Sequence, residues 1–295
     1  MAEIIQKDGT WTFDGESLRL TPGRDKSVGL LRATLGELTV PLAALAGISL
    51  EQGRKNGRLR LRLRDGADPL IQVTHGGLSD SDDPYRLTVE SDRFGVAEYL
   101  VEEVRTALLL NQVPSDPVDA YVLPGPAVPL SVSAGDGTVS FDGENVRLTW
   151  GWKTDDAKAA SGARTLPVAD ITAVRWQPSV GLEHGFLRFT VRGMETEAPA
   201  KYDPHAVELW GFKKDPLMAL VAAAVQARLP HPSAPAAPAP PPVLEPAAPT
   251  PERGAAESDH DALLRRLREL GELHQAGVLT EEEFTVAKQA VLKRM

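Results

Sequence analysis

The sequence contains no cysteine, which excludes disulfide bonds, thiolate zinc sites and cysteine nucleophiles together. Aromatic residues make up only 5%, and no apolar run approaches the roughly 18–20 residues of a membrane span. The formal net charge of −9 is the opposite of the basic surplus of a nucleic-acid-coating protein, so we expect no nucleic-acid partner. The first residues lack an apolar signal segment, and we expect a cytoplasmic protein.

Motifs that carry known chemistries are missing as well. There is no Walker A sequence, dinucleotide fingerprint, nucleophile elbow or zinc-binding His-Glu-x-x-His. The six histidines have no metal-ligand spacing, and the acidic segment 79–84 lacks the glycine and the final glutamate of a calcium loop. We therefore expect no cofactor, no metal and no catalysis; an enzyme with an unrecognised site is the alternative.

The sequence does contain an internal repeat. Gly-Thr-Trp-Thr-Phe-Asp-Gly-Glu-Ser-Leu-Arg-Leu-Thr at 9–21 recurs as Gly-Thr-Val-Ser-Phe-Asp-Gly-Glu-Asn-Val-Arg-Leu-Thr at 137–149. Three further blocks follow in the same order: 39–43 matches 165–169, 57–61 matches 185–189, and 83–84 matches 203–204. Four ordered blocks indicate a duplication.

The repeated blocks have the period of β-strands. Apolar residues alternate on both sides of Asp14 and Gly15, and again around Asp142 and Gly143. An Asp-Gly pair in that setting predicts a two-residue hairpin turn of type I′. Segment 58–64 alternates arginine with leucine, which predicts a strand whose leucines face the core. Trp11 belongs to the same buried pattern.

Each copy then ends in a helical pattern. In the first copy, after an expected cap at Asp92, apolar residues recur at Phe94, Ala97, Val101, Val104 and Leu108. In the second copy, after the helix-start pair Asp215 and Pro216, they recur at Leu217, Leu220, Val221, Ala224 and Val225. Each copy is thus predicted to be a run of short strands followed by one amphipathic helix.

These blocks resemble the domain-of-unknown-function family 4429, an actinobacterial type of repeat. The resemblance rests on the Phe-Asp-Gly-Glu hairpins, the Pro-Leu-Ala and Pro-Val-Ala segments, and the Gly-Arg-Leu-Arg-Leu and Gly-Phe-Leu-Arg-Phe strands. It covers residues 1–111 and 128–230. The fold it implies is mainly β with α: two barrels similar to the pleckstrin-homology (PH) domain, each closed by a C-terminal helix. The family brings no established activity.

Proline marks the connections between these parts. Residues 112–127 form a proline-containing linker, and ten of the 24 prolines lie between positions 230 and 251. We expect 231–257 to be a disordered tether. Its proline-rich part favours polyproline II, and the 22 residues from 230 to 251 reach at most about 70 Å at ~3.1 Å per residue. A ligand for proline-binding grooves is the alternative interpretation.

Residues 258–295 are predicted to form a small α-hairpin. A capping box at Thr280 and Glu283 opens its second helix. The segment resembles the SHOCT (short C-terminal) domain, which implies oligomerisation. So small a unit rarely folds alone, so its apolar face should dock on a second copy of the chain, or alternatively on another protein or on one of the repeats. The residues expected to dock are Leu263, Leu267, Leu270, Phe284 and Val291.

Two groups of residues are candidate ligand sites. The first, here called the arginine face, consists of Arg58, Arg60, Arg62 and Arg64, and the matching strand of the second copy keeps Arg188 and Arg192. It suits an anionic headgroup, a phosphate or an acidic protein, whereas the alternative is a solvated face that discourages edge pairing. The second group, Trp150 and Trp152, either forms an exposed binding edge or is buried.

Together these features predict a non-catalytic cytoplasmic adaptor. Two PH-like modules would bind a protein or peptide weakly, and oligomerisation through the tail would raise the avidity. Peripheral membrane binding through the arginine face is the alternative, which the net charge of −9 opposes.

Overall fold

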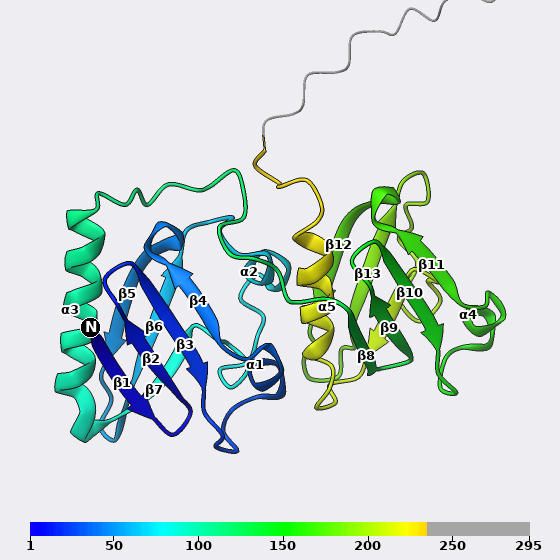
Figure 1. The fold of residues 1–295 in the computed structure, drawn as a ribbon. Coiled ribbons are helices and arrows are strands. Elements are labelled where there is room, and N and C mark those ends of the chain that lie inside the picture. The colour runs from blue at the N-terminus through cyan, green and yellow to red at the C-terminus, as the bar shows by residue number, and fades with distance from the viewer. Residues whose placement is uncertain (235–295) are drawn as a thin grey trace, which may run out of the picture. The chain divides into compact units, whose positions relative to one another are not determined.

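The computed structural model describes residues 1–234, which lie within one compact unit (Figure 1). In these residues fourteen strands form four antiparallel sheets. The predicted hairpin at 258–295, with all five of its docking residues, lies outside the described residues. So does nearly all of the predicted tether at 231–257.

The first copy has a four-stranded and a three-stranded sheet, each paired in chain order. The first contains β1 (Ala2–Gln6), β2 (Gly9–Phe13), β3 (Ser17–Pro22) and β4 (Leu38–Pro41). The second contains β5 (Leu45–Glu51), β6 (Asn56–Leu63) and β7 (Arg86–Glu90). The helices are α1 (Leu30–Leu35), α2 (Pro69–Thr74) and α3 (Phe94–Leu110).

The second copy repeats this plan. One sheet contains β8 (Leu130–Ala134), β9 (Gly137–Phe141), β10 (Asn145–Trp150) and β11 (Arg164–Pro167). The other contains β12 (Ile171–Gln177), β13 (Gly185–Val191) and β14 (Ala206–Leu209). Its helices are α4 (Asp156–Ala160) and α5 (Leu217–Gln226). The strands match one for one, as the duplication requires, but α2 has no counterpart between β13 and β14.

Each copy buries the inner faces of its two sheets in one core. In the first copy Trp11 from one sheet and Leu59 from the other are fully buried in the same cluster. The long helix α3 packs on β1, β5 and β7 and therefore contacts both sheets. No strand pairing joins the two sheets of either copy within residues 1–234, so a closed barrel is not found. Each copy is a two-sheet sandwich with a helix packed against it.

The Asp-Gly hairpins differ from the predicted two-residue turn. The last paired residues are Phe13 and Leu18, which leaves four residues, 14–17, in the loop, and of these only Gly15 has a positive φ, +107°. A type I′ turn needs two consecutive positive φ angles, so that prediction was wrong. Instead, the Asp14 carboxylate accepts the backbone N–H groups two and three residues on, at 2.9 and 2.7 Å. Asp142 makes the same turn in the second copy.

The predicted helix caps were wrong too. Asp92 lies in a 3-10 turn before α3, and no side chain caps that helix. Asp215 faces away from α5, because its carboxylate accepts the backbone N–H groups of Gly211 and Phe212 at 2.7 and 3.1 Å. Asp215 therefore stabilises the turn before its helix, and Asp92 lies before α3 without capping it.

Helix α5 is buried on every side instead of along one stripe. All its residues from Met218 to Gln226 are buried. One side packs on β8, β9, β12 and β13, and the other is covered by α1 and α2 of the first copy (Figure 1). Leu31, Leu70 and Val73 of those helices belong to the same apolar cluster as α5. A helix that is apolar all round requires such cover, so the two copies share a core at α5.

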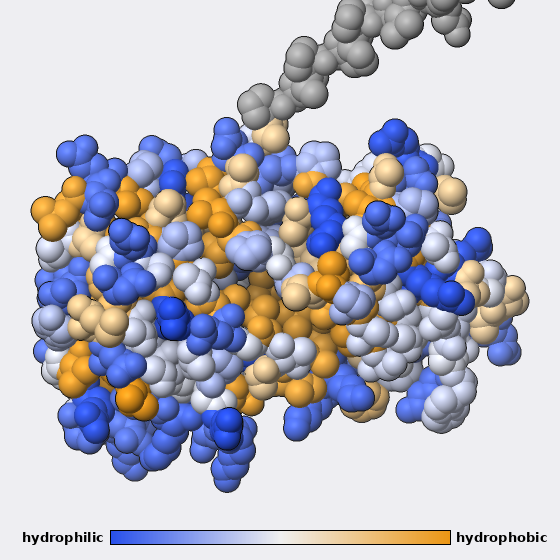
Figure 2. Space-filling model, in the orientation of Figure 1, coloured by the Kyte–Doolittle hydropathy of each residue, from blue (hydrophilic) through white to orange (hydrophobic). Residues whose placement is uncertain are grey.

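Apolar side chains gather at this junction on the face drawn in Figure 2, and hydrophilic side chains cover much of the rest of that face. Within the described residues no helix is both long and apolar enough to cross a membrane.

The linker predicted at 112–127 packs against the first copy. The backbone N–H of Val118 donates to the Asp65 carbonyl at 2.9 Å, and that of Leu123 donates to the Ala67 carbonyl at 2.9 Å. Leu123 is only 3% exposed and belongs to the core of the first copy. The linker therefore extends the first copy rather than bridging open solvent.

Candidate binding groove of the first copy

Strand β6 presents the arginine face to the outside. Burial alternates residue by residue along it, with Leu59, Leu61 and Leu63 buried and the arginines between them exposed. This is the orientation that the period-2 pattern predicted.

Two of the four guanidinium groups are engaged by the protein itself. Arg58 Nη2 lies 2.8 Å from Asp80 Oδ2. Arg64 donates from Nε to the carbonyl of Asp116 at 2.8 Å and from Nη1 to a second backbone carbonyl at 3.0 Å. These contacts hold neighbouring loops in place, so Arg58 and Arg64 are poor candidates for ligand contacts.

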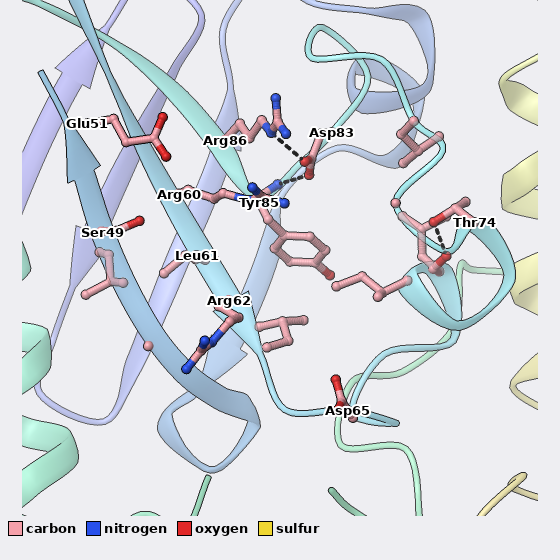
Figure 3. A pocket seen from close by; sticks show the side chains of 17 residues that line it. Ser49, Glu51, Arg60, Leu61, Arg62, Asp65, Thr74, Asp83, Tyr85 and Arg86 are labelled. Carbon is pink, nitrogen blue, oxygen red and sulfur yellow. Dashed lines mark hydrogen bonds and ion pairs between the residues drawn. The ribbon is translucent and has the colours of Figure 1, made fainter. Parts of the chain in front are cut away.

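The other two, Arg60 and Arg62, line a groove with a volume of about 520 Å³ (Figure 3). One wall is the outer surface of β5 and β6, and the other is α2 with the segment that follows it. Neither side chain forms a hydrogen bond or ion pair with another described residue. Of the apolar residues at the groove, Ile71 is exposed and Leu78 partly exposed, whereas Leu61, Leu63 and Leu70 are buried.

Asp83 lies at the end of the groove that contains Arg60 and Arg86. Its carboxylate lies 3.0 Å from Arg86 Nε and accepts the backbone N–H of Tyr85 at 2.9 Å. Figure 3 shows Arg60 and Arg86 close to it. Burial raises the pKa of Asp83, against the pull of Arg60. Burial, together with Arg60 and Arg58, lowers the pKa of Arg86. Asp83 thus forms its ion pair with Arg86, and Arg60 is available to contact a ligand.

A buried hydrogen bond fixes the second wall. Tyr85 Oη donates to Asp68 Oδ2 at 2.7 Å, while Asp68 Oδ1 accepts the backbone N–H of Leu70 at 2.9 Å and so caps α2. Burial raises the pKa of both Asp68 and Tyr85. Asp68 thus connects Tyr85, which directly precedes β7, to the first turn of α2. The groove is therefore preformed.

The second copy lacks this arrangement. Arg188, the counterpart of Arg60, lies with its Nε 2.9 Å from the fully buried Asp203, contacts the Ala198 carbonyl and has its guanidinium 5.2 Å from the Phe186 ring. Arg192 is exposed, but no helix stands between β13 and β14 to form an opposing wall. The structure therefore gives Arg188 a structural contact and leaves Arg192 on an open surface.

The two tryptophans predicted as a pair occupy different environments. Trp152 is 91% exposed, whereas Trp150 is partly buried and donates from Nε1 to the Gly162 carbonyl at 2.8 Å. Lys153 Nζ lies 5.0 Å from the Trp152 ring and 5.3 Å from the ring of Trp210, which follows β14. Sequence reasoning did not foresee the contribution of Trp210.

Sequence reasoning also missed a buried ion pair in each copy. Lys158 Nζ lies 2.6 Å from Asp136 Oδ2 with both side chains almost fully buried, and Arg32 lies 3.6 Å from Asp8 at the same place in the first copy. Burial raises the pKa of Asp136 and lowers the pKa of Lys158. The repeat contained the signal, because Arg32 and Lys158 stand 126 positions apart, like the blocks 39–43 and 165–169.

These pairs are structural, since they lie away from solvent. Elsewhere in residues 1–234, no group of three or more histidines and carboxylates is placed to hold a metal ion.

Comparison with known proteins agrees with the resemblance seen in the sequence. The family model described as "Domain of unknown function (DUF4429)" matches residues 11–105 and 139–226, one stretch in each copy. The model described as "Short C-terminal domain" (SHOCT) matches residues 265–292. No curated protein matches the chain. Because the first model covers more than half of its length, the chain belongs to the DUF4429 family, with two copies of that domain followed by a SHOCT domain.

Proposed function

We propose that the chain is a non-catalytic cytoplasmic adaptor whose first copy binds a segment of a protein partner in the groove between β6 and α2. The observation that carries this proposal is the pair Arg60 and Arg62, which line a preformed groove without partners among the described residues. A guanidinium left uncommitted beside apolar surface is a typical anchor for a protein ligand.

The lining favours a peptide over an anionic headgroup. Three arginines line the groove together with three carboxylates, those of Glu51, Asp65 and Asp83, and the wall at α2 adds the apolar side chains of Ile71 and Leu78. A headgroup carries only negative charge, whereas a peptide offers acidic, basic and apolar side chains to such a mixture. The structure therefore favours the adaptor over membrane binding through the arginine face.

The arrangement of the groove also supports a non-catalytic role. Asp83, which lines the groove, is engaged with Arg86, and the buried Asp68 behind its wall is engaged with Tyr85. A general base needs a free lone pair facing a substrate, and the carboxylates of Asp83 and Asp68 use theirs in structural contacts.

We also propose that each copy is PH-like. A four-stranded sheet, a three-stranded sheet and a helix that contacts both sheets follow one another in each copy, which is the order of that fold. The absence of cysteine fits the reducing cytoplasm.

The C-terminal domain completes the proposal. The SHOCT match at 265–292 supports self-association of the tail. Joining chains would convert weak binding by single grooves into stronger binding of a multivalent partner, because the second contact forms at a high effective concentration.

Affinity purification of the full-length chain, with partners quantified by mass spectrometry, tests the groove. Arg60→Glu/Arg62→Glu should reduce recovery of the specific partner about tenfold or more, because charge reversal in a desolvated contact costs that much. The matched control is Arg175→Glu/Arg192→Glu, which reverses two exposed arginines of the second copy.

The control should recover the partner as well as the unaltered chain does. Equal recovery by both double variants would refute the groove as the binding site.

A further inference from the structure

The second copy carries a cluster of exposed aromatic and basic residues at one end of its sheets. We call it the aromatic–lysine surface, and it consists of Trp152, Lys153, Trp210, Phe212, Lys213 and Lys214. Its residues come from the segment after β10 and the segment after β14, and they surround a shallow hollow of about 410 Å³.

The rings are held around one ammonium group and remain open to solvent. Lys153 Nζ lies 5.0 Å from the ring of Trp152, 5.3 Å from that of Trp210 and 5.8 Å from that of Phe212. Trp152 is 91% and Phe212 57% exposed. Large apolar side chains so exposed indicate a surface that is covered by something else.

The adjacent loop between β12 and β13 adds further apolar side chains. Val180 is 67% and Leu182 100% exposed at its tip. Ser179 in the same loop donates to the Leu209 carbonyl at the end of β14, at 2.8 Å. The loop therefore lies beside the strand end that carries Trp210.

The lysines of this surface form no ion pair with another described residue, and Lys153, Lys213 and Lys214 are all exposed. The acidic side chains near them have other partners. Asp215 is buried and accepts backbone N–H groups of its own turn, Asp155 pairs with Lys201, and Glu208 accepts from Trp210 Nε1 at 3.0 Å.

Hydrogen bonds identify the matching end of the first copy. In the first copy, the backbone N–H of Gly23 donates to the Asp8 carbonyl at 2.9 Å, and the Asp8 carboxylate accepts the backbone N–H of Thr88. In the second copy, Gly151, Asp136 and Glu208 make the same two contacts. In that register Trp152, Lys153, Trp210 and Phe212 correspond to the hydrophilic residues Arg24, Asp25, Glu90 and Asp92.

The scaffold therefore does not require aromatic residues at these four positions. Glu90 of the first copy forms an ion pair there with Lys7, a contact of the kind common on solvated surfaces. The exposed aromatic rings at these positions are a property of the second copy.

We propose that the aromatic–lysine surface docks on an anionic lipid bilayer. Tryptophan and phenylalanine rings partition into the interfacial zone, and lysine ammonium groups reach the phosphates above it. Lysine ammonium groups act as point charges, which suit a diffuse, laterally mobile anionic surface. Because the chain as a whole carries −9, its attraction to anionic lipid has to come from the lysines gathered on this surface.

Co-sedimentation of the full-length chain with vesicles tests this proposal. The chain should pellet with vesicles of phosphatidylcholine and phosphatidylserine, not with phosphatidylcholine alone, and added salt should release it. Trp152→Ala/Phe212→Ala and Lys213→Glu/Lys214→Glu should each weaken vesicle binding about tenfold or more. Thermal unfolding of each variant establishes that it is folded.

Two matched controls should bind as the unaltered chain does. Val96→Ala/Tyr99→Ala removes exposed apolar side chains from α3, and Arg175→Glu/Arg192→Glu reverses two exposed charges elsewhere in the second copy. Arg60→Glu/Arg62→Glu should also keep vesicle binding, which separates this proposal from that of the groove.

Absence of the chain from the anionic pellet at low salt would overturn the proposal. So would undiminished pelleting of the two surface variants. Loss of a protein partner by those variants, without any vesicle binding by the unaltered chain, would assign the surface to an acidic protein instead.

Discussion

Two buried ion pairs, Asp8 with Arg32 and Asp136 with Lys158, occupy the same place in the two copies. Each ties the first turn of its copy to a short helix, α1 or α4. Lys158 also donates to the Ala200 carbonyl at 2.9 Å and lies over the Trp150 ring at 4.6 Å. Such a pair costs desolvation when it forms and costs more when one partner is removed, because the other charge stays buried.

Lys158→Met should therefore destabilise the protein by about 3–5 kcal/mol, since it leaves the Asp136 carboxylate buried without its cation. Denaturant unfolding measures the loss. The control Lys201→Met removes a half-exposed lysine of the same copy that pairs with Asp155, and should leave the stability almost unchanged because solvent screens the pair.

Asp136→Asn/Lys158→Met should recover part of the stability lost by the single change, because no charge then remains buried. A loss no greater than that of the control would show that the pair contributes little.

At the scale of elements, the two C-terminal helices differ because their surroundings differ. The outer face of α3 carries exposed polar residues such as Glu98, Glu102 and Arg105. In α5 the same face is apolar, because α1 and α2 of the first copy cover it. The contact couples the stability of the second copy to residues of the first.

Leu70→Ala should test this coupling. Leu70 is 3% exposed and packs in the cluster that contains α5, so the change should cost about 2–5 kcal/mol. Hydrogen exchange should become faster at the amides of α5, although the substitution lies in the other copy.

The neighbouring Ile71→Ala is the matched control, because Ile71 lies on the same helix and is 39% exposed. It should cost about 1 kcal/mol or less and leave exchange in α5 unchanged. Unaltered α5 exchange in Leu70→Ala would show that the two copies are independent.

The periodicity and repetition of the sequence predicted the features that depend on neighbouring residues. The alternation in β6, the burial of Trp11 and the two-copy plan follow from period and repetition. The turn at Asp14 was not predicted correctly. Hydrogen bonds from the Asp14 carboxylate to the backbone stabilise it, and only one residue needs a positive φ. Boundaries predicted for the linker and the tether stay predictions.

The groove beside β6 and the burial of α5 depend on contacts between segments far apart in the sequence. Patterns of neighbouring residues could not predict them. One signal was present: the offset between the copies falls from 128 at Gly57 to 120 at Asp83. The eight extra residues of the first copy lie where α2 stands. That single insertion builds one wall of the groove and covers α5, so its role appears only when the fold is known.

At the scale of the whole molecule, one scaffold is used twice with different surfaces. The first copy has a groove of mixed charge, and the second has the aromatic–lysine surface. The described residues form one unit, and the SHOCT match lies beyond them at 265–292. We propose a division of labour in which residues 1–234 bind and the C-terminal domain assembles the chains.

Sedimentation velocity of the full chain against a chain that ends at Ala234 tests this division directly. We expect a concentration-dependent oligomer for the full chain and a folded monomer for the shortened one. A monomer in both cases, or the same oligomer in both, would contradict it.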